Sequence, residues 1–196
     1  MTINTRVLAA TIIAVTISCG AAKDTGVYNS VNNGSQPFAL EAVESAFREA
    51  GIPYMENRRD AADFTLSVLT GEEASLESFK GSVVILYFWT TWCPSCIAGM
   101  PALQVLNDRF KNQGLTVLAV NIQESIETVE SFIKSNNYKF TIMLDNESRV
   151  AYRYGINAIP TTYILDRQGR IVSSYLGGKN WENTKNIAAL EALLNE

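Results

Sequence analysis

Two cysteines, Cys93 and Cys96, stand directly after an unbroken apolar run and directly before a helical pattern. The run, Val83–Trp89, does not alternate between apolar and polar residues, so it predicts a strand that is buried on both faces. A Cys-x-x-Cys pair at this place lies in the first turn of the helix, where free backbone N–H groups and the helix dipole stabilise a thiolate. We therefore expect Cys93 to attack as the nucleophile and Cys96 to resolve the product.

Zinc binding, haem attachment and dithiol redox chemistry are the common uses of a Cys-x-x-Cys pair. A zinc site needs more ligands, but the chain of 196 residues has no histidine, and its remaining cysteine, Cys19, lies far upstream. Attachment of a c-type haem needs a histidine directly after the second cysteine, where this chain has Ile97. We therefore expect redox chemistry without a metal or a cofactor. A structural disulfide or an inert pair is the alternative.

The composition is that of a globular protein with a core, because 47% of the residues are apolar and 18% are charged. The net charge of −4 is spread along the chain, and without a basic stripe it argues against nucleic-acid binding. The absence of histidine also excludes Ser-His and Cys-His catalysis. The chemistry is therefore concentrated in the two neighbouring cysteines.

The N-terminus predicts an export signal. The apolar run Val7–Ser18 is too short to span a bilayer and is typical of a signal peptide, here residues 1–18. It leads into Cys19 in a pattern that resembles a bacterial lipobox, except that leucine is usual where this chain has Thr16. The resemblance implies a lipid anchor on Cys19, in the periplasm or at the extracytoplasmic face of a bacterial membrane. Ordinary cleavage near Ala21 and an uncleaved anchor are the alternatives.

The segment that follows predicts a linker and then a helix. Residues 19–36 are polar and rich in Gly, Asn and Ser, so we expect a flexible linker. Apolar residues recur at helical spacing from Pro37 to Ala50, which predicts an amphipathic helix, with a loop up to residue 60. We expect this helix to pack on the domain as a brace or lid, and partner binding is the alternative.

The remaining pattern predicts one domain over residues 61–196. Strands are expected at Asp63–Leu69, Val83–Trp89, Leu115–Asn121, Phe140–Leu144, Thr161–Leu165 and Arg170–Leu176. Helices are expected from Cys96 to about Gln113, at Ile126–Asn136, at Glu147–Tyr154 and at Trp181–Leu194, with a single helical turn at Leu76–Phe79. This order predicts an α/β fold with a mixed central sheet and helices on both faces.

From about Ala61 to Glu196 the chain resembles the TlpA/ResA-type thiol-disulfide oxidoreductases of the thioredoxin superfamily. The motifs that carry the resemblance include Phe88–Cys96 (FWTTWCPSC), Met100–Leu103, Ile159–Asp166 (IPTTYILD) and Gly169–Ile171. It implies a thioredoxin-like fold, and we expect an extra N-terminal helix and a hairpin in addition to it. It also implies that Pro160 is cis and lies against the cysteine pair, beside backbone that pairs with an extended substrate segment.

The resemblance also implies how the site works. Cys93 and Cys96 form a redox-active disulfide and exchange it with a disulfide or dithiol protein through a mixed disulfide, and a membrane electron donor recharges the pair. Trp89, Trp92, Pro94, Ile159 and Pro160 are expected to frame the substrate surface around Cys93. For Trp92 the alternative is plain core packing.

Two positions depart from the family pattern. Gly99 stands where many relatives carry a glutamate, and Tyr87 stands where thioredoxin has a buried aspartate. Both usual sources of buried proton transfer are therefore absent. Glu124 matches an acidic position near the cavity of ResA-like proteins and is a candidate for tuning the thiol pKa values, whereas a solvated loop glutamate is the alternative.

Two other activities stay open at this point. The same chemistry can run towards disulfide formation, and Pro94–Ser95 between the cysteines does not decide the direction. Peroxide reduction of the peroxiredoxin type is the other activity, because Thr90 lies three residues before Cys93 in a Thr-x-x-Cys pattern. The following Pro-Ser-Cys and the lack of a nearby arginine argue against it.

Overall fold

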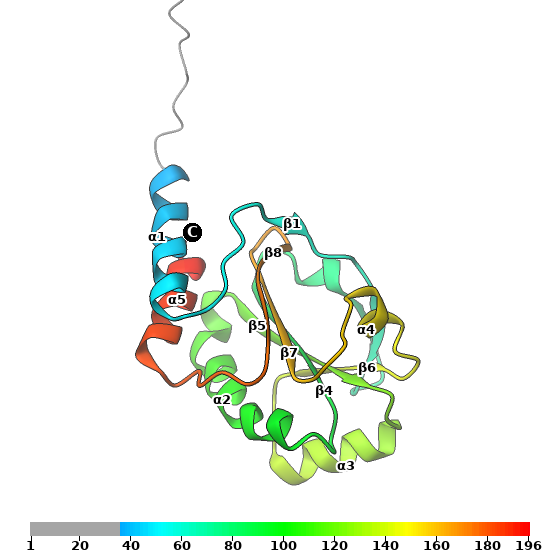
Figure 1. Ribbon diagram of the computed structural model, residues 1–196. Coiled ribbons are helices and arrows are strands. Elements are labelled where there is room, and N and C mark those ends of the chain that lie inside the picture. Colours follow the sequence, from blue (N-terminus) through cyan, green and yellow to red (C-terminus); the bar gives the residue numbers. More distant parts are fainter. Residues whose placement is uncertain (1–35) are drawn as a thin grey trace, which may run out of the picture. The chain divides into compact units, whose positions relative to one another are not determined.

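The computed structural model describes residues 36–196, so the predicted signal peptide, linker and lipidation site at Cys19 lie outside the described residues. Strands and helices alternate around one mixed sheet (Figure 1). The strands are β1 (Arg59–Asp60), β2 (Thr65–Val68), β3 (Glu73–Ser75), β4 (Val83–Trp89), β5 (Leu115–Ile122), β6 (Thr141–Asp145), β7 (Thr161–Leu165) and β8 (Arg170–Leu176). The helices are α1 (Gln36–Glu49), α2 (Pro94–Phe110), α3 (Ile126–Asn136), α4 (Arg149–Arg153) and α5 (Thr184–Leu194), with 3₁₀ turns at Leu76–Phe79 and Lys111–Gln113.

The strand β4 forms the centre of the sheet. The eight strands follow the order β1-β8-β7-β4-β5-β6-β2-β3, so β4 runs parallel to β5 and antiparallel to β7. Every residue of β4 is buried, as its unbroken apolar sequence predicted. The C-terminal end of β4 therefore places Thr90–Cys93 at one end of the central strands of a well-packed sheet.

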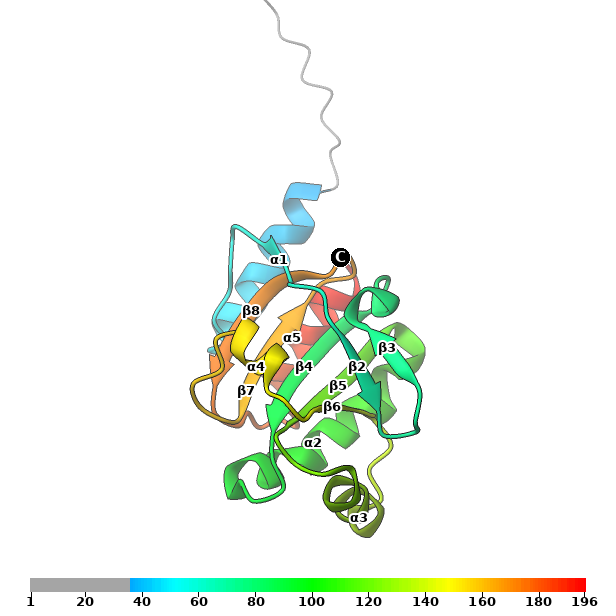
Figure 2. The same cartoon turned by 90° about the vertical axis from the view of Figure 1, so that its right-hand side faces the viewer.

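Helices cover both faces of the sheet, as expected. On one face, α2, α3 and α5 pack their apolar sides over the larger core, which includes Leu103, Leu106 and Phe110 of α2. On the other face, α4 lies in front of the sheet in Figure 2, and Phe88 of β4 is buried there with Tyr154. The predicted mixed α/β architecture with an added hairpin is confirmed.

The helix expected over residues 37–50 is present as α1 and packs as a brace. It lies beside α5 in both views, and the two helices contact each other along their length (Figures 1 and 2). Val43 and Phe47, one turn apart on α1, are completely buried in the larger core. Because these positions repeat at helical spacing, one apolar stripe attaches the helix to the domain.

Some predicted boundaries were wrong. The sheet begins at Arg59, ahead of residue 61, and β3 at Glu73–Ser75 is a strand that was not predicted. The last helix begins at Thr184 because the side chain of Asn183 caps it by accepting a hydrogen bond from the Lys185 N–H at 2.9 Å. Trp181, which was expected inside this helix, is buried against Tyr175.

In residues 36–196 no helix combines the length and apolar character needed to cross a membrane.

Candidate active site

The cysteine pair lies at the N-terminus of α2, as predicted. Cys93 is the N-cap residue, Pro94 occupies the first helical position, and a disulfide joins Cys93 to Cys96. The Cys93 Sγ accepts a hydrogen bond from the Cys96 backbone N–H at 3.2 Å. Both cysteines are buried, but Cys93 is 5% exposed and Cys96 is 0% exposed, so Cys93 is the one of the pair that reaches the surface. After reduction, this N–H and the helix dipole favour a thiolate on Cys93.

The Ile159–Pro160 peptide bond is cis, as the resemblance implied. Pro160 directly precedes β7, whose first residue, Thr161, pairs with Phe88 of β4, so the proline lies at the same end of the sheet as Cys93. The Pro160 carbonyl accepts a hydrogen bond from the Gly177 N–H at 2.7 Å. Within residues 36–196, Ile159 takes part in no backbone hydrogen bond. Its N–H and C=O are therefore available to an extended partner segment.

A turn after β8 connects the proline loop to the cysteine helix. Gly177 bonds to Pro160, and a Cβ on the next residue, Gly178, would lie 3.8 Å from the Ser95 carbonyl oxygen. This is an ordinary van der Waals distance, so the end of β8 lies directly beside the first turn of α2. The cysteines, the cis-proline and the end of β8 therefore form one continuous surface.

Exposed apolar side chains stand on this surface. Trp92 is 70% exposed, which excludes the core-packing alternative, and Leu176 at the end of β8 is 65% exposed. Pro94 is exposed and Ile159 is half-buried, in agreement with their expected places at the rim. Trp89 was predicted at the rim, but this last residue of β4 is completely buried because its ring packs in the larger core beside Phe132 of α3. Leu176 was not predicted as a rim residue, because an apolar residue at this position is already explained by the strand Arg170–Leu176.

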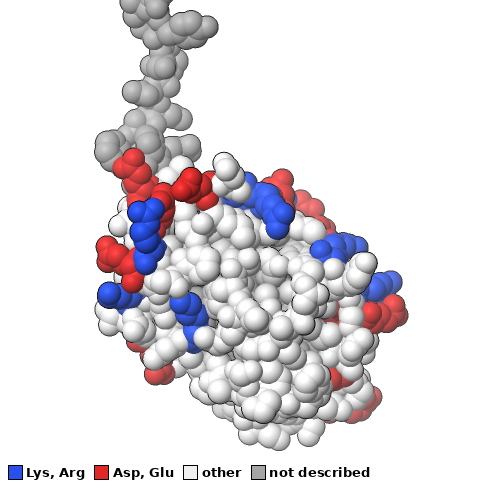
Figure 3. All heavy atoms as spheres, viewed as in Figure 1, with Lys and Arg blue, Asp and Glu red and all other residues white. Residues whose placement is uncertain are grey.

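The segments that build the surface around Cys93 have no charged residues of their own. The three segments that build it, residues 87–107, 154–165 and 171–178, contain no Asp, Glu, Lys or Arg. In Figure 3 the lower part of the visible face, where the end of β4 meets the start of α2, accordingly shows almost no red or blue. A partner therefore meets an apolar and hydrogen-bonding surface with little electrostatic bias.

Glu124 braces the turn that leads to Cys93. One of its carboxylate oxygens accepts hydrogen bonds from the Thr91 backbone N–H and the Asn121 side-chain amide, each at 2.6 Å, and the other accepts from the Thr91 hydroxyl. Gln123, in the left-handed conformation at φ 58°, turns the chain so that the next residue faces Thr91. The alternative of a solvated loop glutamate is therefore wrong. The side chain is tied to the backbone two residues before Cys93.

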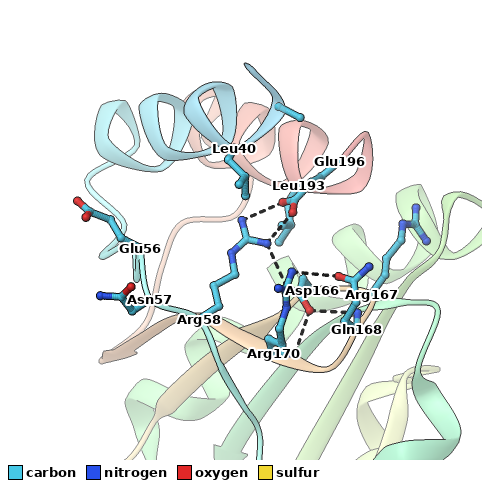
Figure 4. Close-up of a pocket in the computed structure, with 11 residues that line it drawn as sticks. Leu40, Glu56, Asn57, Arg58, Asp166, Arg167, Gln168, Arg170, Leu193 and Glu196 are labelled. Atoms are coloured by element: carbon cyan, nitrogen blue, oxygen red, sulfur yellow. Dashed lines mark hydrogen bonds and ion pairs between the residues drawn. The ribbon is translucent and has the colours of Figure 1, made fainter. Parts of the chain in front are cut away.

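A second charged cluster lies at the opposite end of β7, beside a cavity of about 670 Å³ (Figure 4). The Arg58 guanidinium donates to Asp166 at 3.0 Å and to both carboxylate oxygens of Glu196 at 2.8 Å. Burial lowers the pKa of Arg58, but the hydrogen bonds to Glu196, Tyr54 and Asp166 together raise it above its ordinary value. The side chains of Arg58 and Asp166 are each 3% exposed. This network ties the loop after α1 to the sheet and to α5.

A Cys-x-x-Cys disulfide at a helix N-terminus, reached from the central strand of a mixed sheet and flanked by a cis-proline, defines the thioredoxin-fold thiol-disulfide oxidoreductases. Comparisons with known proteins place this chain in the same class. This chain belongs to the AhpC/TSA family, whose sequence profile matches residues 58–174. Its thioredoxin-like fold and its activity as a protein-disulfide oxidoreductase follow from the relatives described next.

The thiol-disulfide oxidoreductase ResA of Geobacillus thermodenitrificans is 36% identical over 125 residues, covering 64% of this chain and 72% of that protein. The structure of StoA from Bacillus subtilis matches with a TM-score of 0.56 at 33% identity, covering 63% of this chain and 94% of that one. The thioredoxin domain of a thiol-disulfide oxidoreductase from Bacteroides vulgatus matches with a TM-score of 0.61 at 25% identity, covering 69% and 96%. The resemblance inferred from the sequence is confirmed.

Proposed function

We propose that this protein is exported, is held at the extracytoplasmic face of a bacterial membrane by a lipid on Cys19, and reduces disulfides in other exported proteins through Cys93 and Cys96. The observation that carries the proposal is the unequal exposure of the two cysteines at the start of α2. The export signal and lipobox-like sequence support the location.

The proposed reaction proceeds in two exchanges. The Cys93 thiolate attacks one sulfur of a partner disulfide, forms a mixed disulfide and releases the first partner thiolate. Cys96 then loses its proton and attacks the Cys93 sulfur, which closes the Cys93–Cys96 disulfide and releases the second partner thiolate. The partner gains two electrons and this protein loses two. A membrane electron donor of the dithiol class then returns the pair to the reduced state.

The reductive direction is supported by what surrounds Cys93. A strongly oxidising dithiol requires a thiolate that is stabilised far beyond the helix N-terminus, for example by a nearby cation. The segments around Cys93 contain no lysine or arginine, and the chain has no histidine. Equilibration of the purified protein with glutathione measures the potential, and a value near that of a strong oxidase would favour disulfide formation instead.

Peroxide reduction is not supported by the position of Thr90. Its side chain is 2% exposed, and its hydroxyl makes no hydrogen bond within the part of the chain that the structure describes. The segments around Cys93 also have no arginine to polarise a peroxide. A peroxide-consumption assay separates this activity from disulfide exchange.

Exchange of Cys96 for serine is expected to trap partners. In a Cys96→Ser variant the first exchange proceeds and the second cannot, so a mixed disulfide through Cys93 accumulates. Non-reducing gels of cells that express the variant, followed by identification of the captured proteins, provide the measurement. A Cys93→Ser variant is the matched control and should capture nothing through the site, because Cys96, the cysteine left in the pair, is fully buried. Equal capture by both variants would contradict the assigned roles.

The reaction is expected to be nearly independent of salt. Because the three segments around Cys93 contain no charged residue and Glu124 is held by Thr91 and Asn121, the second-order rate constant for reducing an uncharged disulfide peptide should change less than about twofold between roughly 50 and 500 mM salt. Peptides flanked by lysine or by glutamate should react within about threefold of the uncharged peptide. A preference of tenfold or more for one charge would show that charged groups outside these segments select the partner.

A further inference from the structure

Tyr87 lies in β4 beneath the first turns of the helix that carries the cysteines. Its side chain is 2% exposed, and its hydroxyl donates a hydrogen bond to the backbone carbonyl oxygen of Cys96 at 3.0 Å. Burial raises the pKa of Tyr87 well above its ordinary value, so the phenol stays protonated at neutral pH and acts only as a donor. A buried neutral donor thus contacts the backbone of the residue that closes the disulfide.

Gly99 leaves the room that this hydroxyl needs. A Cβ built on position 99 would lie 3.1 Å from the Tyr87 hydroxyl oxygen, which is closer than ordinary van der Waals contact, and 3.9 Å from Cζ of the same ring. Tyr87 and Gly99, the two residues that depart from the family pattern, therefore form a single arrangement in which the phenol fills the space that glycine leaves. The phenol occupies the space beneath position 99, and any side chain at that position would press on the hydroxyl.

The bond is placed where the helix backbone is otherwise less restrained. Pro101 lies inside α2 and has no N–H, so the helical hydrogen bond that would end on the Ile97 carbonyl cannot form. The carbonyl held by Tyr87 belongs to the residue before Ile97. The phenol therefore adds a bond to the carbonyl directly before the one that lacks its helical partner.

We propose that Tyr87, with Gly99, is a positioning residue for the second exchange: its hydroxyl holds Cys96 so that the thiol faces the Cys93 sulfur in the mixed disulfide. This inference rests on the roles proposed above for the two cysteines. No proton passes through the phenol. The Cys96 proton leaves to solvent or to the departing partner thiolate, and the new Cys93–Cys96 bond replaces the mixed disulfide.

The test follows each exchange separately in the full chain. The reduced protein is mixed with an aryl disulfide whose thiolate product is coloured, in a stopped-flow instrument. Attack by Cys93 releases the first thiolate, and attack by Cys96 releases the second. Tyr87→Phe, which keeps the ring, should slow the second release about 3- to 10-fold, as expected for loss of one buried hydrogen bond, and leave the first within about twofold.

A double-mutant cycle with Gly99→Ala provides the decisive comparison. With Tyr87 present, the added Cβ presses on the hydroxyl and should slow the second release by a similar factor. With phenylalanine at position 87 the remaining neighbour, Cζ, lies at an ordinary contact distance, so Gly99→Ala should have no further effect. An equal effect of Gly99→Ala in both backgrounds would overturn the inference.

Tyr175→Phe is the matched control. Tyr175 lies on the same row of the sheet, since Tyr87 pairs with Thr162 and Thr162 pairs with Tyr175, but its hydroxyl has no hydrogen bond to α2. Its removal should leave both releases unchanged. The pH at which the second release is half-maximal should also be the same in the wild type and in Tyr87→Phe, because positioning changes the rate and not the titration.

The outcomes separate this inference from the proposed function. A wild-type protein that gives no second release lacks the assigned two-step exchange, and both proposals are then wrong. A wild type with two releases, together with a Tyr87→Phe variant that resolves at the wild-type rate, overturns only the role of Tyr87. A shift of about half a pH unit or more in the Tyr87→Phe profile would instead indicate an acid–base role and would also overturn positioning.

Discussion

An Arg58→Met variant is expected to lose about 3 kcal/mol of the free energy of unfolding. The guanidinium is 3% exposed and bonds to Asp166 and Glu196, so its removal leaves the buried Asp166 carboxylate with fewer partners. Arg170 still donates to Asp166 at 2.8 Å, and Glu196 is 18% exposed. Because both carboxylates keep some stabilisation, we expect the loss of unfolding free energy to lie at the lower end of the range for breaking a buried ion pair. Urea unfolding of the oxidised protein provides the measurement.

The control for this variant is Arg149→Ala. Arg149 pairs with Glu147 at 3.2 Å, but the two side chains are 78% and 70% exposed, so water already solvates both charges. Such surface pairs contribute about 0–1 kcal/mol. If Arg58→Met destabilised the protein no more than Arg149→Ala does, the Arg58 network would not be what holds the loop after α1 to α5. The first exchange should continue at its usual rate in the folded fraction of both variants.

A Glu124→Ala variant is expected to lose about 2–3 kcal/mol of stability and roughly tenfold in the rate of the first exchange. The substitution leaves the Thr91 N–H, the Thr91 hydroxyl and the Asn121 amide without the acceptor they share. Because Thr91 lies two residues before Cys93, the loosened turn shifts the attacking sulfur. Urea unfolding and the first-release rate of the stopped-flow assay measure the two effects.

Glu124→Gln separates bracing from tuning of the thiol pKa. A glutamine can keep one oxygen for Thr91 and Asn121, and its amide can donate to the Thr91 hydroxyl, so the geometry is retained while the charge is lost. We expect most of the stability to return, with an unchanged pH profile of Cys93 alkylation. If the profile moved by a unit in Glu124→Gln, the carboxylate charge would be tuning the thiol, as the sequence comparison suggested.

The elements around the disulfide could be predicted because their signals are local. Val83–Trp89 was placed to the residue, since a continuous apolar run between turn residues has few other meanings. The start of α2 followed from the Cys93–Cys96 pair, which was expected to span the first turn of a helix directly after the strand. The cis bond at Pro160 came from the motif around it, because no local physical signal marks a cis-proline.

The missed features depend on contacts between distant segments. β3 (Glu73–Ser75) has no apolar alternation and is a strand because β2 pairs with it. The bonds of Glu124 depend on a left-handed turn at Gln123, which sequence propensity does not favour. Leu176 belongs to the rim only because β8 ends beside Pro160 and the Ser95 carbonyl. In each case the sequence shows the residue type, but it does not show which distant residue lies beside it in the fold.

The 3.1 Å separation between a Cβ at position 99 and the Tyr87 hydroxyl also limits which substitutions evolution can accept. The two positions are coupled, because a side chain at 99 presses on the hydroxyl of a tyrosine at 87, and a residue without that hydroxyl relieves the contact. A side chain added at 99 while Tyr87 is present is therefore the crowded combination. We therefore expect the two positions to covary as a single character among relatives of this chain, and the pair Tyr with Gly to mark those in which a neutral phenol replaces the buried acids.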